Sequence, residues 1–207
     1  SGGYDSRLIA TLLKRVGYEN ILTFTYGVPG NKESQYSKKV ADVLGLRWHF
    51  VEYSKELWRE AWQTGERWQY QKWASGWSSI AHVQDWLAVK ILKEQRIVDP
   101  DCAFAPGHCC VTGLIPDYVF DKQAITKNEF LLSLVEKHFS LAPHSLFDLS
   151  KNGKIKHHCE NFSPEKEVFD PDVFVRHFMA YGWQERQAKF ICNSVRVYEF
   201  FGFDWWM

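Results

Sequence analysis

The chain opens with the hexapeptide Ser1-Gly2-Gly3-Tyr4-Asp5-Ser6, in which two glycines stand among hydroxyl and carboxylate side chains. From Arg7 onward the apolar residues recur at helical spacing, and Gly17 is typical of a helix end. A glycine-rich turn that opens a helix normally follows a strand, so we expect a strand before Ser1. The hexapeptide is therefore predicted to be a loop that joins a strand to a helix.

The segments after this helix repeat the alternation of helix and strand. Residues Ile21–Tyr26 are apolar and β-branched and indicate a buried strand. Glu33–Leu44 has helical spacing, and Arg47–Tyr53 indicates a second strand. A unit of helix, glycine and strand thus occurs twice, which favours a parallel sheet with right-handed crossovers.

The rest of the chain is predicted to be mainly helical. The expected elements are a Trp-rich helical region at 54–76, a helix at 80–96, a short strand at 102–105, a helix at 127–139, a polar loop at 141–164 and a helical stretch at 171–201 that could break near Gly182. We expect one α/β domain over residues 1–207 with a helical C-terminal portion. Its soft subdivision lies near residue 122, between an α/β nucleotide-binding part (1–122) and a mainly helical part (123–207).

Composition limits the class of protein. The chain has 207 residues, 45% hydrophobic and 24% charged, which is the range of an ordinary globular domain. Lys+Arg and Asp+Glu are both 25, and this balance argues against nucleic acid as a partner. No apolar run is long enough to span a membrane, and no signal peptide is recognisable at the start. The five cysteines contain no CxxC pair, so we expect a reducing, cytoplasmic location.

Aromatic residues are unusually frequent at 16%, with 10 Trp. Helical spacing predicts that Trp58, Trp62 and Trp86 pack in the core. Trp73 and Trp77 flank Ser75 and Gly76 and are the better candidates for an exposed groove.

The chemistry of the hexapeptide suits a polyphosphate. Gly2 and Gly3 allow backbone N–H groups to approach phosphate oxygens, and the serine hydroxyls add donors. The following helix directs its positive end to the same place. A carboxylate beside phosphates repels them unless a cation lies between, so Asp5 implies Mg²⁺. The alternative is an ordinary glycine turn with an Asp or Ser helix cap.

The hexapeptide resembles the S-G-G-x-D-S signature, or PP-loop, of the N-type ATP pyrophosphatases. Residues 24–34 (FTYGVPGNKES) and 37–45 resemble the second strand, loop and helix of the asparagine synthetase synthase domain. Residues 185–199 resemble a late helix of the same family. Taken together, these stretches are similar to the family's surface-polysaccharide branch. The resemblance implies a Rossmann-like fold of the adenine nucleotide alpha-hydrolase type.

The resemblance also implies a reaction and its cofactors, ATP and Mg²⁺. An asparagine synthase-like amide ligase or amidotransferase transfers AMP from ATP to a substrate carboxylate and releases pyrophosphate. Ammonia or an amine then displaces AMP. No N-terminal Cys nucleophile is present, so a separate glutaminase domain or subunit is a possible partner, beside the small-molecule carboxylate.

Residues in this sequence take the family's roles by position. The phosphates would be held by Ser1, Gly2, Gly3 and Ser6, and Asp5 would bind Mg²⁺ and be catalytic. The strand end Thr25, Tyr26 and Gly27 would meet the adenine, because ligands lie at the carboxyl ends of parallel strands. Glu33 matches an acidic position near the site; equally, it is a first-turn acid that favours the helix dipole.

One departure from the family lies in the second loop. Relatives carry a loop rich in Gly and Asp (S-G-D-G-x-D-E), whereas residues 106–113 here read PGHCCVTG. Gly107 fits the pattern, but the acid is absent, and the nearest downstream is Asp117. A nucleotide-binding module that does not catalyse is therefore the alternative function. A tRNA-modifying relative is a weaker one, because no basic stripe is present.

Overall fold

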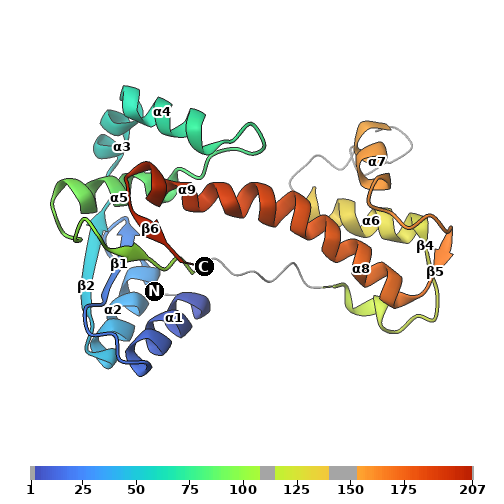
Figure 1. Ribbon diagram of the computed structural model, residues 1–207, viewed down its shortest axis with the longest axis horizontal. Coiled ribbons are helices and arrows are strands. Elements are labelled where there is room, and N and C mark those ends of the chain that lie inside the picture. Colours follow the sequence, from blue (N-terminus) through green and yellow to red (C-terminus); the bar gives the residue numbers. More distant parts are fainter. Residues whose placement is uncertain (1–2, 108–114, 140–152, 207) are drawn as a thin grey trace. The chain divides into compact units, whose positions relative to one another are not determined.

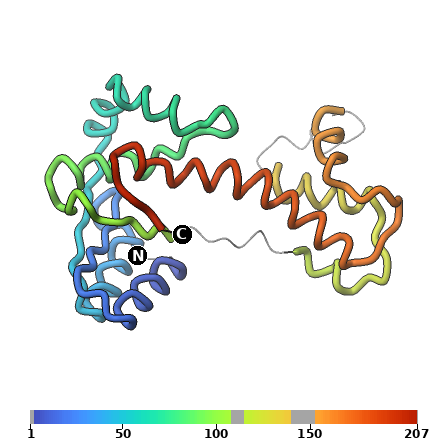
Figure 2. The backbone as a smooth tube through the Cα atoms, viewed as in Figure 1, coloured from blue at the N-terminus to red at the C-terminus, as the bar shows by residue number. Residues whose placement is uncertain are grey.

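The computed structural model describes residues 3–107, 115–139 and 153–206. The chain divides into two compact units, which are described separately. Unit 1 consists of Ser1–Cys110 and Lys189–Met207, and unit 2 consists of Val111–Ala188. The C-terminal segment therefore returns to the N-terminal unit, as the red end of the tube in Figure 2 shows among the blue and green segments. The reading of residues 1–207 as one family domain stays a prediction.

Unit 1 alternates helices and strands along its first half. Its elements are α1 (Tyr4–Arg15), β1 (Leu22–Gly27), α2 (Lys32–Leu44), β2 (Arg47–Glu52), α3 (Lys55–Trp62), α4 (Gly65–Ala74), α5 (Gln84–Glu94), β3 (Ala103–Phe104), α9 (Cys192–Phe200) and β6 (Asp204–Trp205). The predicted unit of helix, glycine and strand is found twice, as α1 with β1 and as α2 with β2, and the Trp-rich region at 54–76 forms two helices.

The strands of unit 1 form two parallel pairs. β1 runs parallel to β2 from the pair Leu22 and Arg47 to the pair Gly27 and Glu52, and β3 runs parallel to β6. The helix α2 packs on β1 and β2, α1 packs on α2, and α5 packs on β2 (Figure 1). The expected α/β class with parallel strands is confirmed at this level.

Local chemistry explains where α2 begins and ends. The Asn31 side chain accepts a hydrogen bond from the Ser34 N–H at 2.8 Å and so caps the helix N-terminus. Gly45 ends the helix in the left-handed region at φ 65°, where a glycine carries no Cβ penalty. These two residues therefore set the two ends of the helix that connects the parallel strands.

The core of unit 1 lies between its strands and the helices α4, α5 and α9. Trp86, Leu92 and Val197 are completely buried in it. The prediction of a core position is confirmed for Trp86 and wrong for Trp62, which is 44% exposed. Trp73 and Trp77 are exposed as expected, at 43% and 91%. The apolar stripe of α1 is also largely exposed, with Leu8 at 59% and Leu12 at 45%.

Unit 2 has its own core. Its elements are the 3-10 turn η1 (Asp117–Val119), β4 (Ile125–Thr126), α6 (Lys127–His138), α7 (Gly153–Glu160), β5 (Val168–Phe169) and α8 (Pro171–Tyr181). β4 and β5 are antiparallel, and Phe130, Phe174 and Leu134 are fully buried. The helical stretch does not break near Gly182, because α8 continues there as the π-helix η3 (Gly182–Ile191) and then as α9.

In the part of the chain that the structure describes, no helix is both long and apolar enough to cross a bilayer.

Candidate nucleotide-binding site

The N-terminus of α1 has no side-chain cap. Gly3 is the N-cap residue and provides no side-chain hydrogen bond to the helix. The first N–H groups of a helix have no acceptor within the helix, and a twelve-residue helix adds the positive end of its dipole. Asp5 lies in this first turn and is exposed. Of the predicted loop, Gly3, Asp5 and Ser6 are described, whereas Ser1 and Gly2 lie outside the described residues.

The segment that follows β3 approaches this helix terminus closely. A Cβ placed on Gly107 would lie 3.1 Å from the Ser6 backbone N, and closer still to the Ser6 Oγ. A side chain at this position would require Ser6 to shift, so glycine is the residue that fits here without movement. The structure thus brings Gly107 and Ser6, which are 101 residues apart in the sequence, to one place. The rest of the loop predicted to lie here, residues 108–113, is outside the described part.

An arginine that the sequence reasoning passed over lies beside the same terminus. The Arg7 Nε donates to the Gly3 carbonyl at 3.3 Å, and its guanidinium carbon lies 4.4 Å from the centroid of the Tyr4 ring. The cation therefore lies within one turn of the exposed N–H groups. The sequence signal for Arg7 was its position directly after the hexapeptide, since a cation there would offset the charge of a bound phosphate.

The carboxyl end of β1 is held from two sides. The Thr25 hydroxyl bonds the Ser37 hydroxyl of α2 at 2.5 Å, and the Trp48 Nε1 donates to the same Ser37 oxygen at 2.9 Å. The next side chain, Tyr26, donates its phenol proton to Asp85 of α5. Thr25 and Tyr26 are therefore engaged inside the protein through their side chains. Contact with a base at this strand end would therefore involve the backbone and not these two side chains.

Gly27 and Glu33 complete the predicted set. Gly27 has φ 136°, which only glycine adopts readily, and its carbonyl accepts from the Tyr53 N–H at 2.8 Å. Glu33 lies in the first turn of α2 and is exposed. Both readings of Glu33 remain open, since an exposed first-turn acid suits the dipole as well as a ligand.

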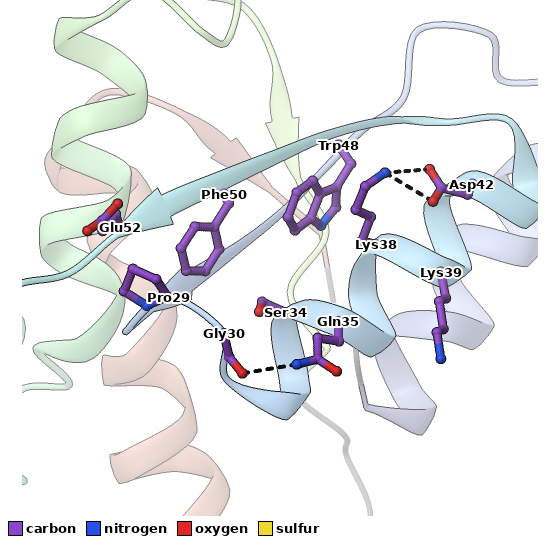
Figure 3. A pocket seen from close by; sticks show the side chains of 10 residues that line it. All are labelled: Pro29, Gly30, Ser34, Gln35, Lys38, Lys39, Asp42, Trp48, Phe50 and Glu52. Carbon is purple, nitrogen blue, oxygen red and sulfur yellow. Dashed lines mark hydrogen bonds and ion pairs between the residues drawn. The ribbon is translucent and has the colours of Figure 1, made fainter.

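A separate groove of about 470 Å³ lies along α2 and β2 (Figure 3). Trp48 and Phe50 project from β2 and stack at 6.0 Å and 16°. Opposite them, the Lys38 Nζ pairs with the Asp42 carboxylate at 3.0 Å. The lining consists of Pro29, Gly30, Ser34, Gln35, Lys38, Lys39, Asp42, Trp48, Phe50 and Glu52. None of the residues predicted for the nucleotide site is among them, so the groove is not the site predicted from the hexapeptide.

The carboxylates of the described residues suit a cation that is bound together with a nucleotide better than a cation held by protein side chains alone. Within the described ranges, no group of three or more His, Cys, Asp or Glu side chains gathers to hold a metal ion. Mg²⁺ is commonly held by one or two carboxylates together with substrate phosphates. Asp5, beside an uncapped helix N-terminus, supplies a carboxylate of that kind. The residues present are therefore compatible with Mg²⁺ that arrives with ATP.

Comparison with known proteins assigns the N-terminal segment. Residues 1–64 match the family model described as asparagine synthase. This range contains the hexapeptide, α1, β1, α2 and β2, and it supports an asparagine synthase-like family fragment. No curated protein and no solved structure matches the chain.

Proposed function

We propose that unit 1 binds Mg·ATP at the N-terminus of α1 and that the protein is an asparagine synthase-like amide ligase or amidotransferase. The observation that carries the proposal is the approach of Gly107 to Ser6 at a helix terminus without a side-chain cap. The match of residues 1–64 to the asparagine synthase model supports it, because that family is ATP-dependent. The two parallel strand pairs are compatible with a Rossmann-like fold of the adenine nucleotide alpha-hydrolase type.

Each residue near the helix terminus has a part in the proposed binding. The backbone N–H groups from Gly3 to Ser6 and the Ser6 hydroxyl would hold the β- and γ-phosphates. Asp5 would ligate Mg²⁺, which lowers the repulsion between phosphate charges when it is bound. The backbone of Tyr26 and Gly27 would meet the adenine. The protein's contribution is orientation and charge neutralisation, without a covalent protein intermediate.

The proposed reaction has two displacements. A carboxylate oxygen of the substrate attacks the α-phosphorus of ATP, the bond to the β-phosphate oxygen breaks, and pyrophosphate leaves. Ammonia or an amine then attacks the acyl carbon, and AMP leaves with the electron pair of the broken C–O bond. Ammonia could come from a separate glutaminase domain or subunit. The cysteine pattern fits a cytoplasmic location.

A second function is favoured by the composition of the second loop. Residues 106–113 contain no Asp or Glu, so an acidic metal ligand expected from the family is absent there. With Asp5 as the single carboxylate assigned to the metal, the chain could bind ATP without turning it over. The two functions share the binding site and differ in the chemistry.

Product analysis separates these functions. The full-length protein is incubated with ATP, Mg²⁺ and a panel of small carboxylic acids, with ammonia as the nitrogen donor. Formation of AMP and pyrophosphate in equal amounts, lost in Asp5→Asn and kept in Asp42→Asn, supports the ligase. Asp42 is a matched control because its carboxylate is exposed and pairs with Lys38 one helical turn away. ATP binding without products supports the module, and release of orthophosphate contradicts the ligase.

A further inference from the structure

A buried carboxylate lies near the proposed base site. Asp85 is in the first turn of α5 and is only 8% exposed. Burying a carboxylate is costly unless hydrogen bonds compensate it. Its Oδ1 accepts the phenol proton of Tyr26, and the His82 Nδ1 lies 3.9 Å from the same oxygen. An apolar side chain at this position could not accept the phenol proton of Tyr26.

The neighbouring phenols remain neutral and bind elsewhere. Burial first, and then the charge of Asp85, raises the pKa of Tyr53 and Tyr70. The Tyr53 hydroxyl donates to the Gln84 carbonyl at 2.7 Å, and the Tyr70 hydroxyl donates to the His82 carbonyl at 2.5 Å. Neither of these phenol protons is donated to Asp85. Tyr26 is thus the phenol whose proton goes to the carboxylate itself.

The bond from Tyr26 ties α5 to the carboxyl end of β1. Tyr26 is the penultimate residue of β1, and its ring stacks on that of Tyr53 at 5.1 Å and 25°. On the other face of the strand, Thr25 is bonded to Ser37 of α2. The end of β1 is therefore clamped from both faces by side chains of two helices. Such support is what holds a binding backbone in a fixed geometry before the ligand arrives.

We propose that Asp85 is a positioning residue of the nucleotide site. Through the Tyr26 phenol it fixes the backbone of Tyr26 and Gly27, against which the adenine of ATP lies. The inference rests on the proposed function, because it assumes that ATP binds with its base at this strand end. It assigns Asp85 no contact with the phosphates or the reacting atoms.

Two ligands distinguish positioning of the base from general loss of structure. Binding of Mg·ATP and of Mg·tripolyphosphate to the full-length chain is measured by calorimetry. Tyr26→Phe and Asp85→Ala should each weaken ATP binding about tenfold, the loss of roughly one hydrogen bond to a charged group, and should leave tripolyphosphate binding within about twofold. Asp85→Asn should largely retain ATP binding, because its amide oxygen still accepts the phenol proton.

Tyr70→Phe is the matched control. It removes a buried phenol proton from the same core but none that is donated to Asp85, and ATP binding should change less than about twofold. Equal ATP binding by the wild type, Tyr26→Phe and Asp85→Ala overturns the inference alone. Parallel loss of both ligands also overturns it, since that indicates a structural role. If the wild type binds tripolyphosphate but not ATP, or neither, the proposed function itself fails.

Discussion

Gly107 is the residue on which the geometry of the site depends most directly. A methyl group there would meet the Ser6 Oγ and lie 3.1 Å from the Ser6 backbone N, so Ser6 would have to shift. We expect Gly107→Ala to lower ATP affinity about tenfold, in line with the ~1–3 kcal/mol cost of inserting a methyl group into a filled space.

The control for this substitution is Gly65→Ala. Gly65 opens α4, and a Cβ placed on it meets nothing within 4 Å. Its variant should bind ATP like the wild type in the same titration. Unchanged binding by Gly107→Ala would mean that the loop after β3 takes no part in the site.

At the residue scale, the sequence indicated the glycines of the site but not the side-chain hydrogen bonds that hold the end of β1. The hexapeptide predicted an open helix terminus, and Gly107 could be matched by its place after a strand. The engagement of Thr25 with Ser37, and of Tyr26 with Asp85, depends on side chains brought together from different helices. No spacing rule contains that information, so Asp85 was not among the predicted site residues.

At the scale of single elements, α6 carries a well-defined N-terminus. The Thr126 hydroxyl accepts from the Glu129 N–H at 3.3 Å, and the Glu129 carboxylate accepts from the Thr126 N–H at 2.8 Å. The Lys122 ammonium also bonds Glu129. The Lys122 bond first, and then the Thr126 bonds, lowers the pKa of Glu129 from 4.5 to about 2. The charged form is therefore stabilised in the folded protein.

This lowered pKa predicts a pH dependence with a definite sign. The stabilisation by Glu129 is fully present above its unfolded pKa of 4.5 and is lost as the pH falls towards about 2. We expect Glu129→Gln to lower the urea midpoint of unit 2 at about pH 7, and the difference from wild type to shrink below about pH 4. Glu136→Gln, an exposed change on the same helix, should show neither effect. A difference independent of pH would contradict the assignment.

Helices and strands with strong periodicity followed from the sequence. Leu22–Gly27 and Lys32–Leu44 lie within a residue or two of their predicted bounds. The division of 54–76 into α3 and α4 did not follow, because the break at Thr64 is created by its capping bond to the Arg67 N–H. The glycine at 182 suggested a break in the helix, whereas the structure continues through it as the π-helix η3.

At the scale of the whole molecule, the chain forms two compact units, each with its own core. Phe130 is fully buried in unit 2, where its ring meets Phe169, Phe174 and Phe178. We expect Phe130→Ala to destabilise unit 2 by about 3–5 kcal/mol. ATP affinity should remain that of the wild type, because the proposed site is built from unit 1 alone.

This independence is tested by measuring hydrogen exchange at increasing denaturant concentration, together with an ATP titration. Leu132→Ala on the same helix is the control, because Leu132 is 37% exposed and its loss should cost far less. Loss of ATP binding in Phe130→Ala at a temperature where unit 1 stays protected would show that unit 2 contributes to the site. The helical C-terminal portion was predicted, but its return to unit 1 was not, since such long-range packing leaves no periodic signal.

The central claim is that the first turn of α1 holds the phosphates of ATP. A crystal structure of the full-length protein with Mg²⁺ and α,β-methylene-ATP tests it most directly. We predict β- and γ-phosphate oxygens about 3 Å from the amide nitrogens between Gly3 and Ser6, beside Gly107. Phosphates bound at Lys38 and Lys39 in the groove along α2, with the turn at Gly3 empty, would contradict the account.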